Sequence, residues 1–94
     1  MTIVWSPRAI EHLTHLRSSI ARDNPGAANR IGGTLLDAVG RLAELPSLGR
    51  LGRVAGTREL VVPGTPYVIP YRLRGDRVEV IAVFNVRQKW PKQL

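Results

Sequence analysis

The chain has 94 residues, 44% of them hydrophobic and only 5% aromatic, which suffices for one small domain over residues 1–94 with an aliphatic core. It contains no cysteine, which excludes a disulfide framework and a thiolate zinc site. Met1 is not followed by a basic leader with an apolar segment, and no apolar run approaches a membrane span, so we expect a cytoplasmic protein.

The net charge of +7 is concentrated in the C-terminal half of the chain. Residues 1–47 hold five Arg and four acids, whereas residues 48–94 hold nine Lys or Arg and three acids. Arg outnumbers Lys by 12 to 2, and Arg is the residue that suits bidentate binding of phosphate and carboxylate groups. The asymmetry indicates a face for nucleic acid or for an acidic protein segment.

The N-terminal half predicts a short strand and two helices. Ile3–Trp5 is the strand, and Ser6-Pro7 is typical of an N-cap and first helical residue, so a helix should run from Pro7 to about Arg22. Asn24-Pro25 repeats this signal and predicts a second helix as far as Leu45. The connection is so short that the helices must form an αα-hairpin.

The segment Ser47–Thr57 is expected to be a loop. It is rich in glycine and lacks the Gly-Lys-Ser/Thr ending of a phosphate-binding loop, so we interpret it as a flexible connector whose Arg50 and Arg53 are exposed.

Three strands should complete the domain: Arg58–Val62, Tyr67–Leu73 and Val78–Phe84. Gly75-Asp76 is a two-residue turn of type I′ or II′, which would place Arg72 opposite Glu79 and Ile69 opposite Ala82. Pro70 should lie at an edge or a bulge because it lacks an amide donor. The prediction is an α+β fold with an N-terminal strand, an αα-hairpin and a three-strand antiparallel meander packed on the helices.

The alternation of side chains gives this sheet two different faces. The face expected to pack on the helices is uniformly apolar: Ile69, Tyr71, Leu73, Val78, Val80, Ala82 and Phe84. The opposite face is basic near the turn and apolar farther away: Val68, Pro70, Arg72, Arg74, Arg77, Glu79, Ile81 and Val83.

No catalytic set, cofactor site or metal site is expected. His12 and His15 lie on one side of the first helix, but the sequence supplies no third ligand, so we interpret both as surface histidines. The strands offer carboxylates without a histidine or a cysteine, so no catalytic triad can be assembled.

The candidate partner-binding residues are basic or aromatic. Arg58, Arg72, Arg74 and Arg87 could bind phosphates or carboxylates, and Arg72 could instead pair with Glu79 across the hairpin. Trp90 could pack with partial exposure or stack on a partner.

The chain resembles the RelE/ParE superfamily of bacterial type II toxins over nearly its whole length. The resemblance lies in six motifs in order: Trp5-Ser6-Pro7-Arg8-Ala9, Asp23-Asn24-Pro25-Gly26-Ala27-Ala28, Leu45-Pro46-Ser47-Leu48-Gly49-Arg50, Gly56-Thr57-Arg58-Glu59-Leu60-Val61-Val62, Pro66-Tyr67-Val68-Ile69-Pro70-Tyr71-Arg72, and Arg87 with Trp90-Pro91. The sequences of these motifs resemble those of ParE-like members more than those of RelE-like members. In the fifth motif, RelE-like ribonucleases have a sequence similar to Tyr-Arg-Leu-Val-Tyr, and this chain has Val68 at the position of the Arg. The ribonucleases also tend to end with a catalytic residue, and in this chain no Tyr follows Asn85.

A ParE-like chain implies a non-enzymatic toxin that inhibits DNA gyrase and is neutralised by a cognate ParD-like antitoxin in a hetero-oligomer. The first alternative is a RelE-like ribosome-dependent mRNA endoribonuclease, in which Arg58 and Arg87 would support cleavage. The second is an antitoxin-binding module without toxicity. Direct binding of nucleic acid stays open.

Overall fold

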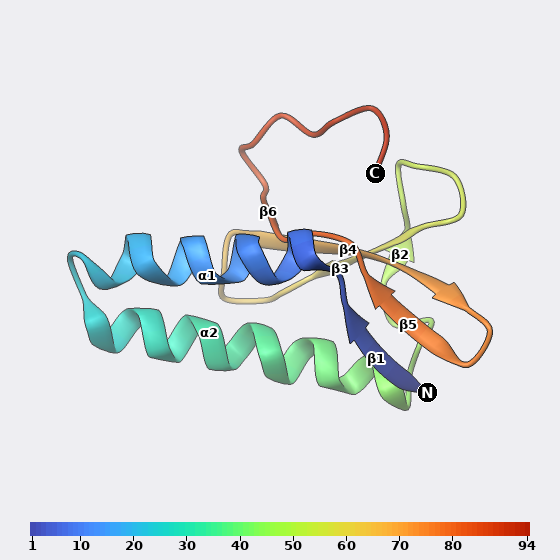
Figure 1. Cartoon of the computed structure of the whole chain (residues 1–94), viewed down its shortest axis with the longest axis horizontal. Helices are drawn as coiled ribbons and strands as arrows, with labels where there is room; N and C mark the ends of the chain where they lie inside the picture. Colours follow the sequence, from blue (N-terminus) through green and yellow to red (C-terminus); the bar gives the residue numbers. More distant parts are fainter.

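Two antiparallel helices pack on one face of a mixed β-sheet in the computed structural model, which describes all residues 1–94 (Figure 1). Helix α1 is Pro7–Ala21, and the Ser6 hydroxyl caps it by accepting from the Ala9 amide at 3.0 Å. Helix α2 is Pro25–Gly40, and Asn24 accepts from the Ala27 amide at 3.0 Å. Both predicted caps are confirmed.

The second helix ends earlier than predicted. It gives way at Gly40 to the 3-10 turn η1, Arg41–Ala43, rather than continuing as α-helix to Leu45. Leu42 of this turn is fully buried, so the tighter winding still directs an apolar side chain into the core.

The sheet is mixed rather than wholly antiparallel. Its order is β1-β5-β4-β3-β2, with β6 also paired to β4, and β1 runs parallel to β5. Strands β3, β4 and β5 form the predicted antiparallel meander, and β1 joins it in parallel. A short strand also occurs inside the segment predicted as loop. The strands are β1 Thr2–Trp5, β2 Arg50–Leu51, β3 Arg58–Val61, β4 Tyr67–Arg74, β5 Arg77–Val80 and β6 Phe84–Asn85.

The predicted hairpin register is confirmed near the turn. Arg72 lies opposite Glu79, and Arg74 opposite Arg77. Gly75 has φ +61° and no other residue of the turn has positive φ, which identifies a type II′ turn.

Beyond Val80 the predicted register is wrong. Strand β5 ends there, so Ile69 does not pair with Ala82, and β6 resumes with Phe84 opposite Val68, one residue out of step. This shift is the effect of a bulge. Val83 consequently packs in the main core, whereas Phe84 is buried outside that cluster.

Pro70 accounts for the bulge. Its carbonyl accepts from the Ile81 amide at 2.9 Å, but it has no N–H to return to the Ile81 carbonyl. The Ser6 hydroxyl donates to that carbonyl instead, at 2.8 Å. One serine thus caps α1 and completes a sheet position that the proline leaves open.

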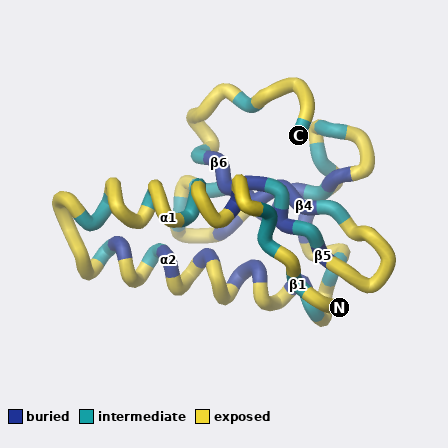
Figure 2. The backbone as a smooth tube through the Cα atoms, viewed as in Figure 1, coloured by how far each residue is buried: buried dark blue, intermediate teal, exposed yellow.

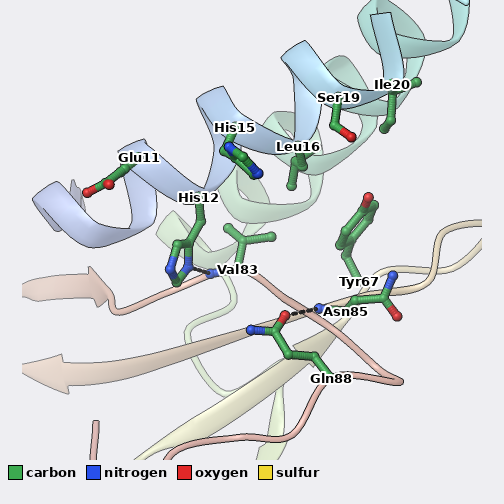
Figure 3. A pocket seen from close by; sticks show the side chains of 10 residues that line it. All are labelled: Glu11, His12, His15, Leu16, Ser19, Ile20, Tyr67, Val83, Asn85 and Gln88. Carbon is green, nitrogen blue, oxygen red and sulfur yellow. Dashed lines mark hydrogen bonds between the residues drawn. The ribbon is translucent and has the colours of Figure 1, made fainter. Parts of the chain in front are cut away.

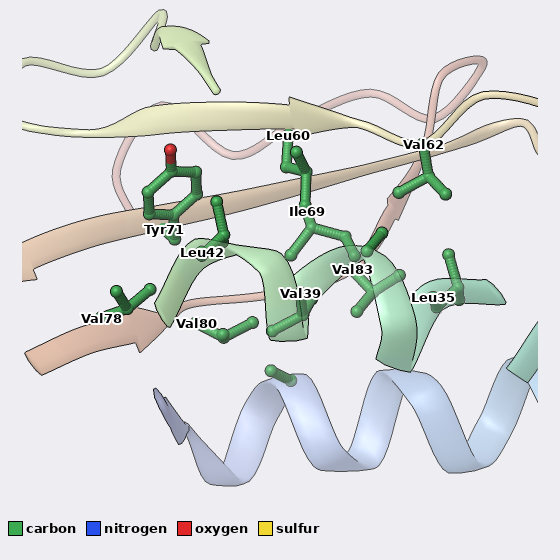
Figure 4. Close-up of a cluster of buried hydrophobic side chains, with 12 residues drawn as sticks. Leu35, Val39, Leu42, Leu60, Val62, Ile69, Tyr71, Val78, Val80 and Val83 are labelled. Atoms are coloured by element: carbon green, nitrogen blue, oxygen red, sulfur yellow. The ribbon is translucent and has the colours of Figure 1, made fainter. Parts of the chain in front are cut away.

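The core lies between α2, the first turns of α1 and the inner face of the sheet (Figure 4). Tyr71, Ile69, Val78 and Val80 are fully buried, as predicted for the helix-facing side. Leu73 is the exception, with 40% of its surface exposed, because the β4–β5 hairpin extends beyond the helices (Figures 1 and 2).

The helices of this chain fall short of a bilayer span, since none combines the necessary length with sufficient hydrophobicity.

The double role of Ser6 leads to a stability prediction. Ser6→Ala should lower the free energy of unfolding by about 2 kcal/mol, because it removes a helix cap and leaves the Ile81 carbonyl without a donor. Asn24→Ala is the matched control, since Asn24 caps α2 alone and should cost about 1 kcal/mol. Urea unfolding of both variants measures the difference, and equal losses would contradict the second role of Ser6.

Candidate functional site

The outer face of the sheet, on the side away from the helices, carries the sequence-predicted cations of the hairpin. Side chains directly opposite one another share a face, so Arg72, Glu79, Arg74 and Arg77 all lie on this side. The opposite end of the same face is apolar, where Val68 and Phe84 are paired. This division between a basic and an apolar end was predicted, although with Val83 rather than Phe84 at the apolar end.

A buried carboxylate organises the middle of the outer face. Glu59 is only 3% exposed and accepts hydrogen bonds from the Arg50 side chain at 2.9 Å, from the Arg53 amide at 2.8 Å and from the Arg53 guanidinium at 3.0 Å. Burial by itself raises the pKa of Glu59, but the hydrogen bonds from Arg53 and Arg50 outweigh it and lower the pKa to about 2. The carboxylate is therefore charged at neutral pH.

This cluster corrects the interpretation of Ser47–Thr57 as a flexible connector. The Arg50 and Arg53 side chains are 57% and 48% exposed, yet both are fixed by Glu59. Sequence reasoning overlooked Glu59 as the centre of this cluster. The available signal was an acid within a strand close to two arginines, Arg50 and Arg53, in an otherwise basic half of the chain.

Trp90 attaches the C-terminal tail, residues 86–94, to this cluster. The Arg53 guanidinium carbon lies 3.5 Å from the centre of a Trp90 ring, within cation–π range, and the Phe84 ring centre is 4.7 Å away. Trp90 is half-buried, so it packs with partial exposure as predicted. The tail leaves the sheet after β6 and turns back toward the β2–β3 loop, 52–57 (Figure 1).

Arg58 lies on the other side of the sheet from Arg72 and Arg74. It is opposite Tyr71, on the helix-facing side, and donates to the Gly49 carbonyl at 2.8 Å and the Ser47 carbonyl at 3.4 Å. Arg58 therefore fixes the connection between α2 and β2, although it also lines a small surface pocket together with Arg72.

The same connection is held by the Tyr71 hydroxyl. It donates to the Pro46 carbonyl at 2.7 Å and accepts from the Gly49 amide at 2.8 Å. A Cβ atom at Gly49 would lie 2.6 Å from the Tyr71 ring, so only glycine fits there.

The remaining candidates are exposed or weakly paired. Glu79 binds Arg74 at 3.4 Å. The ion pair with Glu79, one of the two alternatives for Arg72, therefore does not form, although the two residues are opposite in register. Arg87 is exposed, and its backbone amide donates to the Asn85 side chain at 3.0 Å. The structure thus brings Arg72 and Arg74 together, and Trp90 connects the tail that bears Arg87 to the same face.

A groove of about 400 Å³, lined by polar and apolar residues, lies between α1 and the β4–β6 end of the sheet (Figure 3). His12, His15, Tyr67, Asn85 and Gln88 contribute to its lining. His12 corrects the prediction of a surface histidine, because its Nδ1 accepts from the Val83 amide at 3.1 Å and its ring contacts Phe84. Burial and the charge of Arg8 lower the pKa of His12. No group of ligands in the chain could hold a metal ion.

A second groove, partly apolar, lies beside β3 and adjoins the Glu59 cluster. A groove of about 300 Å³ runs between the C-terminal end of α2 and β3, where β2 pairs with only the first two residues of β3. Leu48 and Val61 are the exposed aliphatic residues of its lining, and they lie beside the charged residues Arg41, Arg50 and Glu59. An apolar patch of this kind is typical of a protein-binding surface.

Comparison with known proteins identifies close relatives over the whole chain. Residues 3–90 match the family model described as the ParE toxin of the type II toxin-antitoxin system parDE. Protein Y4kP of Sinorhizobium fredii is 44% identical over 98% of this chain and 95% of its own length. Toxin RelE2 of Caulobacter vibrioides is 41% identical over 86% of this chain and 90% of its own length.

A solved structure shares the fold. The structure titled as the chromosomal ParDE system of P. aeruginosa superimposes with a TM-score of 0.84 at 20% identity, covering 90% of this chain and 95% of that chain. The predicted α+β fold of the RelE/ParE type is therefore confirmed.

The Glu59 cluster predicts a specific acid sensitivity. The folded pKa of about 2 lies below the reference value of 4.5, so this group stabilises the fold fully above about pH 4.5 and loses that contribution as the pH falls toward 2. The contribution is about 3 kcal/mol. Glu59→Gln should lower the neutral-pH free energy of unfolding by about 2 to 3 kcal/mol.

Denaturant unfolding at several pH values measures this effect. Glu44→Gln is the matched control, because Glu44 is exposed and has no ion pair. If Glu59→Gln and Glu44→Gln unfold alike across this pH range, Glu59 does not stabilise the fold as described.

Proposed function

The chain belongs to the ParE toxin family of type II toxin-antitoxin systems, and from this premise we propose that it arrests bacterial growth by binding and inhibiting DNA gyrase. It would act in the cytoplasm without catalysing a reaction itself, and a cognate ParD-like antitoxin would neutralise it.

The observation that carries the gyrase proposal is that this chain lacks free cations at two of the positions where a RelE-like ribonuclease would need them. Val68 stands at the position where the resemblance implies an Arg, and it is buried. Arg58 is engaged with the Gly49 and Ser47 carbonyls rather than free for a phosphate. Of the residues expected to support RNA cleavage, only Arg87 is exposed.

The ribonuclease alternative also has support. Two relatives from Caulobacter vibrioides bear the name Toxin RelE, at 41% and 37% identity. The groove beside α1 contains His12, His15 and Tyr67, which are side-chain types capable of proton transfer. An experiment must therefore separate the two targets.

The antitoxin proposal rests on the apolar groove between α2 and β3. A partner segment with apolar side chains could cover Leu48 and Val61, and acidic residues in it would complement a chain of charge +7. A disordered segment that folds on binding would suit so open a surface.

Inducible expression in a bacterium with two reporters tests the target. Gyrase inhibition predicts growth arrest with a rise in the SOS response while bulk translation is initially intact. Immediate loss of translation with cut mRNA and no SOS signal would refute the gyrase proposal in favour of a ribonuclease. Soluble protein that causes no arrest would indicate a binding module without toxicity.

A single charge in the apolar groove tests the antitoxin surface. Leu48→Asp should weaken binding of the cognate antitoxin at least about tenfold, because it replaces an apolar contact with a negative charge that repels an acidic segment. Leu73→Asp is the control, since Leu73 is similarly exposed but lies on the β4–β5 hairpin, away from this groove. Calorimetric titration measures both affinities, and equal losses would mean that the groove is not the docking site.

A further inference from the structure

We propose that the outer face of the sheet and the C-terminal tail together bind the backbone of duplex DNA. In one respect this inference depends on the proposed function: the choice of DNA over an RNA duplex follows from a target enzyme that holds DNA. The cationic surface itself is an observation about this chain and goes beyond inhibition of an enzyme.

The first support is the spacing of cations on β4. Arg72 and Arg74 are two residues apart on one strand, so they point to the same face about 7 Å from each other. This separation resembles that of neighbouring phosphates along a DNA strand. Guanidinium groups also suit phosphate oxygens, to which they can donate two hydrogen bonds.

The second support is an unfavourable pair within the hairpin. Arg77 lies directly opposite Arg74, and like charges in this position destabilise a β-hairpin. Glu79 offsets only part of the repulsion, since its contact with Arg74 is 3.4 Å long and Arg74 is 61% exposed. An arrangement that costs stability in the free protein would be relieved by an anionic ligand.

The tail adds further charge to the same face. Trp90 is held against Phe84 and Arg53, and this contact anchors the tail that bears Arg87, Lys89 and Lys92. The outer face, its turn and the tail together carry eight cations against three acids, which accounts for most of the net charge. The cations are Arg50, Arg53, Arg72, Arg74, Arg77, Arg87, Lys89 and Lys92, and the acids are Glu59, Asp76 and Glu79.

The surface suits a duplex better than a single strand or a protein. Binding of single strands relies on aromatic platforms for base stacking, but Trp90 is covered by Arg53 and Phe84. Protein interfaces have apolar centres, whereas the hairpin end of this face is made of three arginines and a glutamate. Contacts with a charged duplex backbone need neither feature.

Fluorescence anisotropy with a labelled 20-base-pair duplex, in about 50 to 200 mM salt, tests the inference. The combined variant Arg72→Gln, Arg74→Gln and Arg77→Gln should lower the slope of log affinity against log salt by about 2 to 3. Affinity at the lowest salt should fall at least about tenfold.

The matched control removes the same charge from the helices. Arg8, Arg22 and Arg30 are exposed on or beside α1 and α2 and their side chains make no ion pair, so the triple change to Gln should preserve the slope. Circular dichroism confirms that each variant remains folded.

Trp90 acts here as a positioning residue. Trp90→Ala should lower affinity for the duplex about threefold to tenfold, because the cations of the tail are no longer kept on the face. Trp90→Phe should restore most of the affinity, since a phenyl ring can still stack on Arg53. Equal losses in the two variants would contradict the positioning role.

The proposal would be overturned if the chain did not bind the duplex at low salt, or if the two triple variants had equal effects. It would also be overturned if polyglutamate bound as tightly as the duplex and lost the same affinity in the Arg72, Arg74 and Arg77 variant. An RNA duplex bound tenfold more tightly than DNA would overturn the choice of DNA. A supercoiling assay with purified gyrase separates this inference from the proposed function. If the native chain binds the duplex but does not inhibit gyrase, the proposed function is refuted while the proposed DNA-binding surface stands.

Discussion

The lack of a backbone N–H donor at Pro70 is the constraint on which the arrangement of this sheet depends. Because Pro70 cannot donate to Ile81, the Ser6 hydroxyl takes over that position and joins the start of α1 to the sheet. The chain then bulges, and Phe84 emerges on the outer face rather than the inner one. The aromatic contact that anchors Trp90 exists only because of this reversal.

On the outer face, the buried carboxylate of Glu59 is paired with two arginines, and further exposed cations surround this group. Glu59 is buried and satisfied by Arg50 and Arg53, so this carboxylate and the two guanidinium groups that bind it make a rigid unit rather than mobile surface charges. The indole of Trp90 stacks on Arg53 and extends this unit to the tail. The groove between α2 and β3 shares Arg50 and Glu59 with this unit, so the apolar residues Leu48 and Val61 lie next to the charged cluster.

Local chemical signals made much of the fold predictable. Ser6-Pro7, Asn24-Pro25 and Gly75-Asp76 each encode a cap or a turn within a few residues, so both helix starts and the hairpin register could be read directly. The parallel partner of β1 depends on contacts across more than 70 residues, which no local pattern specifies. Pro70 indicated an edge or a bulge but did not fix the place of the bulge after Val80. The candidate site was harder for the same reason, since strand alternation alone did not reveal that Arg58 anchors a connection.

The close contact between Gly49 and the Tyr71 ring has an evolutionary consequence. Neither residue can change alone, because any side chain at position 49 would collide with the ring, and loss of the Tyr71 hydroxyl would leave Gly49 and Pro46 without their partner. Substitutions at these two positions should therefore be coupled among relatives. The connection between α2 and β2 would then be kept together with Tyr71 among relatives, while the surfaces on either side of it vary in sequence.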